Sequence, residues 1–213
     1  MTLRLSSSTN NLMLQTISKF NTLLLAALVF VSAATFNSSK VNARSSQNID
    51  ITQLPTSSQV AAAPEWKTFS PDEGKFSILM PSEEISDMAP DKTEMHSGVK
   101  STKMYMSIHE QNVFMVSYAD FNNDLTQASS SELLDSAVQG MLDDGEKLLS
   151  QQNLTLGAYS GREIKLWDEK QGITLTGRIF IVNQRMYMLL VGGKENPQVS
   201  DTNKFFNSFR LMP

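Results

Sequence analysis

Two histidines, His96 and His109, are the only imidazole bases in the sequence. A serine hydrolase needs such a base within hydrogen-bond reach of its nucleophile, and many present that serine on a Gly-x-Ser-x-Gly turn. Neither histidine lies near a turn of that kind, and both have polar neighbours, which is typical of exposed loops and strand ends. The sequence therefore predicts no catalytic residue and favours a protein that is not an enzyme.

Oxygen-bearing side chains recur at alternate positions in residues 120–124, Asp-Phe-Asn-Asn-Asp, just before a predicted helix. That spacing lets a loop wrap calcium, but an EF-hand also needs glycine at its sixth position and glutamate at its twelfth. Leu125 and Ser131 stand at those positions, and Glu132 comes one residue late. We interpret the segment as a polar turn, because Asn and Asp side chains satisfy turn amides without an ion. Calcium binding near Asp120 stays open as the alternative.

Methionine is unusually common, and two pairs alternate within apolar strands: Met104 with Met106, and Met186 with Met188. Paired thioethers can bind Cu(I) where thiols are absent, and His96 beside Met95 would add a mixed ligand set. Methionines that alternate in a strand also fill irregular gaps in a core. We favour the core interpretation, and the sequence predicts no cofactor and no metal ligand.

Other polar and aromatic residues have simpler interpretations. Gly192-Gly193 lacks the Lys-Ser ending of a phosphate-binding loop, which argues against a nucleotide site. Trp167 and Arg178 are candidates for the outer face of a sheet, where they could anchor a partner, although the main helix could equally bury the tryptophan. Four acidic residues of the predicted helix are expected on its solvated face: Asp135, Asp143, Asp144 and Glu146.

Composition excludes several classes of protein. The 213 residues contain no cysteine, which rules out a disulfide scaffold, a thiolate metal site and a lipid-anchored lipoprotein. Acidic residues outnumber basic ones by 22 to 18, whereas a nucleic-acid-binding surface needs clustered Lys and Arg. We expect no nucleic-acid partner.

The first 47 residues contain four basic side chains and no acidic one. Their centre, residues 22–36, is an apolar stretch of the length that an export signal uses. Small residues place the expected cleavage after Ala43, with Ala34 as the alternative, so residues 1–43 are predicted to be a signal peptide. An uncleaved anchor, which would be the only membrane contact, and an organelle transit peptide stay open.

Two further segments follow the leader. Residues 44–64 are small and polar and contain two prolines, so they are expected to form a flexible linker. Residues 65–213 are long enough for one self-sufficient domain. This part carries 14 basic and 21 acidic side chains, a net charge of about −7, which favours basic partners at long range.

Period-two apolar patterns dominate the predicted domain, and helical spacing occurs in one long stretch and one short one. Ser129 and Glu132 form a capping-box pattern, which predicts an amphipathic helix over 131–151, and Asp201 is expected to cap a short second helix. Strands are expected at 66–70, 75–80, 102–108, 113–118, 153–158, 162–167, 173–182 and 186–191. This order predicts an α+β sandwich with a mostly antiparallel sheet.

The opening WKTFSPDEGKFSILMP at 66–81 and the closing FFNSFRLM at 205–212 resemble the PsbP-like group of exported modules. That group includes thylakoid-lumen PsbP proteins, Mog proteins and bacterial DcrB-like envelope proteins, and it implies an α/β/α sandwich. PsbP implies a non-catalytic photosystem II subunit that assists retention of manganese, calcium and chloride. The chain departs from PsbP because no aromatic residue follows Pro81 closely and because the linker is almost uncharged. No functional residue is carried over.

The resemblance and the leader together predict an exported, non-catalytic module in the periplasm or the thylakoid lumen. Its acidic surface or a sheet edge is expected to dock on a protein assembly there, with a photosynthetic assembly in the lumen as one option. The alternative is an envelope protein that binds a small ligand or a metal, with a pocket near the four paired methionines or near Asp120.

Overall fold

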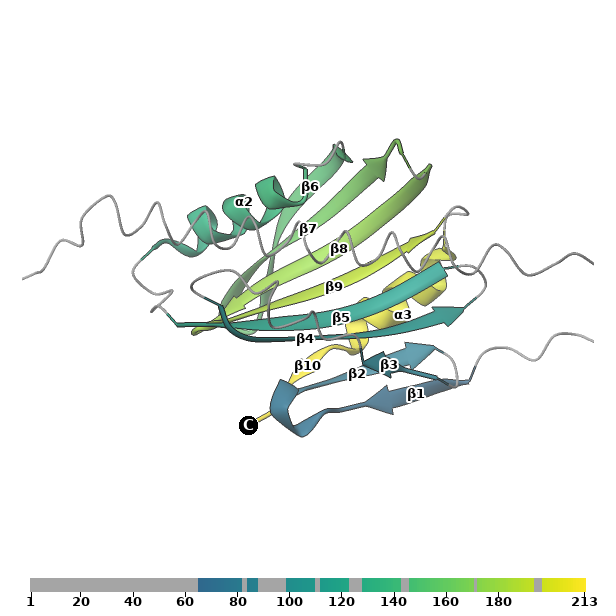
Figure 1. Ribbon diagram of the computed structural model, residues 1–213, viewed down its shortest axis with the longest axis horizontal. Coiled ribbons are helices and arrows are strands. Elements are labelled where there is room, and N and C mark those ends of the chain that lie inside the picture. Colours follow the sequence, from purple (N-terminus) through teal and green to yellow (C-terminus); the bar gives the residue numbers. More distant parts are fainter. Residues whose placement is uncertain are drawn as a thin grey trace, which may run out of the picture.

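The computed structural model describes residues 65–81, 84–87, 99–109, 112–122, 128–142, 146–170, 172–193 and 197–213. These residues form a seven-stranded sheet, a three-stranded sheet and two α-helices (Figure 1). All strand pairs among them are antiparallel, which confirms the predicted α+β class with a mostly antiparallel sheet. The predicted leader and linker lie outside the described residues.

The large sheet has the strand order β3-β4-β5-β9-β8-β7-β6. The central strand β9 lies between β5 and β8 and is buried at every position after its first. Its sequence is apolar on both faces, as expected for a strand covered on two sides. The bounds are Ser86–Asp87 for β3, Val99–His109 for β4, Asn112–Phe121 for β5, Glu146–Leu156 for β6, Tyr159–Asp168 for β7, Ile173–Val182 for β8 and Arg185–Gly193 for β9.

The small sheet consists of β1 (Trp66–Phe69), β2 (Phe76–Pro81) and β10 (Arg210–Leu211), with β2 in the middle. A 3₁₀ turn, η1 (Asp72–Gly74), connects β1 to β2, as the Pro-Asp-Glu-Gly sequence predicts. Lys75 ends this turn in the left-handed region with a φ of 53°. The alternating residues of β2 then bury one face against the large sheet, which makes the small sheet a cover for it.

Each face of the large sheet has its own apolar core. Helix α2 (Ser130–Gly140) covers one face and packs against β7 and β8. Helix α3 (Val199–Ser208) and the small sheet cover the other face, which contains most of the aromatic rings. Figure 1 shows α2 and the β1–β2 hairpin on opposite sides of the large sheet. We call these two sides the α2 face and the α3 face.

The predicted helix over 131–151 is wrong in its second half. Helix α2 ends at Gly140, and residues 146–156 form strand β6 instead. Gly140 and Gly145 disfavour a helix at this point, since glycine is about 1 kcal/mol worse than alanine in a helix interior. The decisive gain is the ladder of β6 with β7, which pairs residues across the whole length of both strands. Local spacing cannot report that long-range pairing.

The capping box at the start of α2 is confirmed. The Ser129 hydroxyl accepts from the Glu132 backbone N–H, and the Glu132 carboxylate accepts from the Ser129 N–H at 3.1 Å. Ser129→Ala is therefore expected to lower the free energy of unfolding by about 1 kcal/mol, because one helix N–H loses its acceptor. Urea unfolding of the full chain measures this loss. Ser130→Ala is the control, since Ser130 is exposed and makes no cap; an equal loss in both variants would contradict the assignment.

Helix α3 begins one turn earlier than its sequence predicts. Gln198 is the N-cap residue and accepts from the backbone N–H of Asp201, so Asp201 lies in the first turn and is not the cap. Phe205 and Phe206 are buried as expected, and Phe209 follows the last helical residue in extended backbone. Of the helices in the described ranges, none has the length and apolar character to cross a bilayer.

Candidate functional site

Arg185, the first residue of β9, joins the two sheets. Its Nε donates to Asp120 Oδ1 at 2.6 Å and its Nη2 donates to Asp120 Oδ2 at 2.8 Å, a two-point ion pair across the β5–β9 ladder. Its Nη1 donates to the backbone carbonyls of Glu73 and Gly74 in the 3₁₀ turn, at 2.9 and 2.8 Å. One guanidinium therefore connects the end of the large sheet to the β1–β2 hairpin.

The environment of this ion pair favours the ionised form of Asp120. Burial on its own opposes ionisation, but hydrogen bonds from Arg185 and from the Ser101 hydroxyl outweigh it, so the pKa of Asp120 is lowered. The guanidinium also lies over the Tyr118 ring, 4.2 Å from its centroid. Beside it, the Tyr187 hydroxyl donates to the Gly74 carbonyl at 2.8 Å, and burial raises the pKa of Tyr187. The cluster fixes the 3₁₀ turn in place.

A cleft of about 590 Å³ opens next to the ion pair. Its floor is formed by residues at the ends of strands β5, β8 and β9 on the α3 face. One wall is formed by Lys75 and by the residues that follow β10. The Lys75 ammonium donates to a backbone oxygen of Pro213, the last residue of the sequence, at 3.2 Å. The lining residues are Lys75, Asp120, Tyr159, Val182, Asn183, Gln184, Arg185, Tyr187, Leu211, Met212 and Pro213. We call this space the junction cleft.

The opposite edge of the large sheet is open. Strand β6 is eleven residues long and pairs only with β7 among the described strands. Its residues 147–153 are all exposed, and Leu149 is 55% exposed beside a register shift between Leu148 and Ser150. The other edge strand, β3, has two described residues. The long edge therefore presents a row of backbone groups that no described strand pairs.

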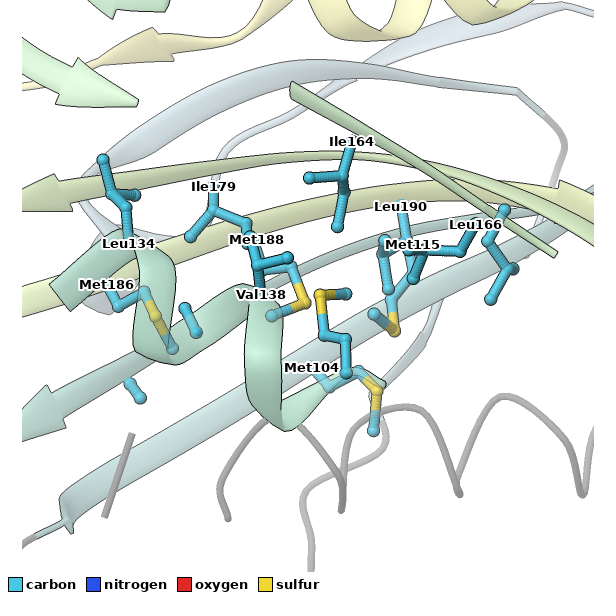
Figure 2. Close-up of a cluster of buried hydrophobic side chains, with 14 of the residues drawn as sticks. Met104, Met115, Leu134, Val138, Ile164, Leu166, Ile179, Met186, Met188 and Leu190 are labelled. Atoms are coloured by element: carbon cyan, nitrogen blue, oxygen red, sulfur yellow. The ribbon is translucent and has the colours of Figure 1, made fainter. Parts of the chain in front are cut away.

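The paired methionines lie in the core, as predicted. Met104, Met106, Met186 and Met188 are each at most 4% exposed and belong to the core on the α2 face. Figure 2 shows the labelled methionines among Leu134 and Val138 of α2 and the apolar residues of the strands. None of these methionines lines the junction cleft, which lies at Asp120, the other position that the alternative hypothesis named.

Asp120, the first ligand of the calcium site considered for residues 120–124, is already engaged in an ion pair. Asp120 lies in β5, not in a turn, and both of its carboxylate oxygens already bind Arg185. Asn123 and Asp124 lie outside the described residues, as does His96. In the parts of the chain that the structure describes, no three His, Cys, Asp or Glu side chains gather into a group that could hold a metal ion.

Trp167 and Arg178 lie on the same sheet face but not side by side. Trp167 pairs with Thr174, whereas Arg178 pairs with Glu163 further along the ladder. Arg178 donates to Glu163 at 2.6 Å and lies under α3, 4.9 Å from the centroid of the Phe206 ring. The pair expected as a joint partner anchor is therefore not formed.

The remaining candidates have structural roles. Gly192 lies within β9, where a Cβ would come 2.3 Å from Leu175, so this glycine permits packing. His109 ends β4. Among the acidic residues predicted for one helix, Asp135 pairs with Arg162 at 2.6 Å and Glu146 begins β6, while residues 143 and 144 lie outside the described residues.

Sequence reasoning missed Arg185 and the β6 edge. The sequence offers one signal for Arg185: it is a charged residue at the start of a strand that is otherwise apolar on both faces. A charge in that position needs a buried or half-buried partner, but the sequence does not say which one. For β6, the absence of charge and proline over residues 148–156 was the available signal.

Comparisons with known proteins find a likeness in fold and none in sequence family. No family model matches the sequence, and no curated protein matches it. A solved structure with a similar fold is PsbP (CyanoP) from Synechocystis sp. PCC 6803, at 10% identity and a TM-score of 0.46, covering 72% of this chain and 95% of that one. Another is LpqN of Mycobacterium tuberculosis, involved in cell envelope biogenesis, at 14% identity and a TM-score of 0.37, covering 71% and 85%. At these identities, the role of neither protein is carried over to this chain.

Proposed function

We propose that this chain is an exported, non-catalytic module that docks on another protein of its compartment through the open edge of β6. The observation that carries the proposal is the eleven-residue edge strand, whose residues 147–153 are exposed and whose outer backbone groups no described strand pairs. An extended segment of a partner can add to such an edge by main-chain hydrogen bonds, which is a common mode of peptide recognition. The apolar, acid-free leader supports export.

The chemistry of β6 suits a neutral extended segment. Residues 148–156, LLSQQNLTL, contain no charge and no proline, two of the features with which proteins block an open edge. Because this edge is uncharged, pairing with it would rely on main-chain hydrogen bonds and not on charge. The β6–β7 register places Gln151 and Asn153 on the α2 face and Gln152 and Leu154 on the α3 face, so an added strand would meet mostly amide side chains.

Helix α2 leaves this edge accessible. It packs over β7 and β8 and ends at Gly140, before β6 begins. The side chain of Gln152 is held by Glu163 of β7, with Nε2 to Oε1 at 2.6 Å, which keeps it on the sheet surface. The outer side of the strand stays available for pairing.

Two proline variants test the edge. Neighbouring residues of an antiparallel strand direct their N–H groups alternately toward the partner strand and away from it. One of Gln151→Pro and Gln152→Pro therefore removes an outward N–H and keeps the β6–β7 ladder, whereas the other breaks a ladder bond and lowers the melting temperature. We expect the variant with the unchanged melting temperature to lose docking. The assay is photo-crosslinking in the native compartment from a probe at Asn153, followed by hydrogen exchange on the purified complex.

The expected result is one crosslinked protein whose presence slows exchange of the β6 amides, and which the stable proline variant no longer captures. A probe at Lys67, on the edge strand β1, is the control position and should not capture that protein. Capture that persists in the stable proline variant would contradict the proposal. A crosslinked species of twice the chain's own mass would also contradict the proposal, because it would show that two copies of this chain pair with each other.

A further inference from the structure

One part of the α3 face is not covered like the rest. Helix α3 contacts β8 at Arg178, whose guanidinium lies over the Phe206 ring and donates to the Asn207 side chain at 3.1 Å. The rest of this face, over β6, β7 and the first half of β8, carries side chains that are exposed or partly exposed. They include Ser150, Lys165, Trp167, Thr174 and Thr176.

A recess of about 200 Å³ lies in this part of the face. The strand registers set Ser150 of β6 and Thr176 of β8 on either side of Lys165 of β7, so three side chains form one row across the recess. The next row carries Glu163, whose two carboxylate oxygens accept hydrogen bonds from side chains of β6 and β8, each at 2.6 Å. The recess is therefore polar, and Glu163 is held in place beside it.

The side chains of that row are free to bind a polar ligand. Among the described residues, the hydroxyls of Ser150 and Thr176 and the ammonium of Lys165 have no hydrogen-bond partner and no ion pair. A hydroxyl both donates and accepts, and an ammonium has three donors. A ligand with several hydroxyls can therefore replace the water at all three groups and keep their hydrogen bonds.

Trp167 follows on the same face, two residues beyond Lys165 and about 7 Å further along β7. It is partly exposed, and among the described residues its ring contacts no other ring and its indole N–H has no acceptor. The other tryptophan, Trp66, packs against Phe114 and under the Lys204 ammonium. An indole combines an apolar ring with one polar N–H, so Trp167 offers a ligand both a stacking surface and a donor.

We propose that the recess and Trp167 together bind a saccharide of two or more pyranose rings. A pyranose has hydroxyls around its rim and C–H groups on its two faces, so it uses free hydroxyl partners and an aromatic ring at once. The recess of about 200 Å³ is smaller than the usual small-molecule site of about 300–1,000 Å³, so it accommodates one ring. The distance from Lys165 to Trp167 then places the next ring over the indole.

Other classes of ligand fit this surface less well. A fatty ligand would cover the three polar groups of the row without giving them partners, which costs free energy. A small inorganic anion would use the Lys165 ammonium but leave the indole without a contact. The site lies on the face of the sheet, so it does not depend on strand addition at the edge of β6.

Three disaccharides test the proposal: cellobiose, chitobiose and maltose. Each is titrated into the isotope-labelled full chain, and the indole N–H signals are followed by NMR. The chain has two tryptophans, so the Trp66 signal is an internal control, and the signal that Trp167→Phe removes belongs to Trp167. We expect at least one disaccharide to shift the Trp167 signal at millimolar concentration while the Trp66 signal stays in place. Its monosaccharide unit, glucose or N-acetylglucosamine, should bind about tenfold more weakly, because it cannot reach both the recess and the indole.

Variants then test the two parts of the site. Trp167→Ala is expected to weaken binding about tenfold, and Trp167→Phe to retain most of it, because phenylalanine keeps an aromatic face. Ser150→Ala should weaken binding several-fold and leaves the core intact, because Ser150 is exposed. Tyr159→Ala is the matched control, since Tyr159 is a partly exposed aromatic residue on the same face of β7 and outside the recess.

The melting temperature of each variant shows that it is folded. The proposal is overturned if none of the three disaccharides shifts the Trp167 signal, or if the Trp66 signal moves as much. It is also overturned if Trp167→Ala and Tyr159→Ala weaken binding alike. If Trp167→Ala does not fold, unchanged binding by Ser150→Ala overturns it.

Discussion

Phe209→Ala is expected to lower the free energy of unfolding by about 3–5 kcal/mol, the usual cost of truncating a buried phenylalanine. Phe209 is 2% exposed and lies between both sheets and the end of α3. Its ring contacts those of Phe76, Phe180 and Tyr187, with centroid separations of 5.6, 6.0 and 5.4 Å. The truncation leaves a cavity where the small sheet meets the large one, because rings fixed from three strands cannot collapse into it.

Urea unfolding followed by circular dichroism measures this loss. Val199→Ala is the control within the same C-terminal segment, because Val199 is 75% exposed and its change should stay within about 0.5 kcal/mol. A loss below about 1 kcal/mol for Phe209→Ala would mean that the ring does not join the two sheets in solution.

Arg185→Gln is expected to lower the free energy of unfolding by about 2–4 kcal/mol at neutral pH, since it leaves Asp120 ionised and half-buried without its cation. The carbonyls of Glu73 and Gly74 lose their donor in the same change. Arg210→Gln is the control, because within the described residues Arg210 donates to backbone carbonyls of Asn207 and Phe209, which are near its own position. Equal losses in the two variants would contradict the role assigned to Arg185.

The effect of Arg185→Gln should also depend on pH. The folded-state pKa of Asp120 is lowered, so the ion pair contributes stability above the ordinary Asp pKa of about 3.9, and that contribution is lost as the pH falls through the folded value. In the variant, burial without the guanidinium instead favours the neutral carboxyl. The difference in unfolding free energy between wild type and variant should therefore be largest near neutral pH and shrink below about pH 4. A difference that grows in acid would show that another group carries the effect.

The strands were largely predictable because each buries one or both of its faces. Phe76, Ile78 and Met80 alternate in β2 and are all buried, as the period of two requires. Strand β8 has the predicted bounds, Ile173–Val182. The capping box at Ser129 was also predictable, because a cap is formed by residues three apart in the chain.

Strand β6 was mispredicted because its side chains report little about burial. Leu148 and Leu149 fit a helical spacing with the leucines of α2, yet both are exposed in β6. An edge strand gains its stability from the ladder with its neighbour, here β7, which follows it in the chain. Side-chain periodicity carries no information about backbone pairing. The helical spacing therefore predicted a helix through residues 146–151, which instead form β6 by pairing with β7.

The candidate sites depended on contacts between distant residues. Arg185 and Asp120 are 65 positions apart and Lys75 is further still, so no motif spacing joins them. Asp120 drew attention as a calcium ligand because the sequence shows its neighbours but not its partner. Only the β5–β9 register, which sets Asp120 opposite Arg185, decides that the carboxylate serves an ion pair.

The sequence by itself determined the absence of thiol chemistry, the acidic balance of the domain, the alternating strands and the methionine-rich core. These follow from composition and from side-chain periodicity, which act over a few residues. The tertiary structure alone decided where α2 ends, which strand is left at the open edge, and that Lys75, Tyr159 and Arg185 line one cleft. The physical reason is that these features arise from backbone pairing and charge neutralisation between residues far apart in the chain.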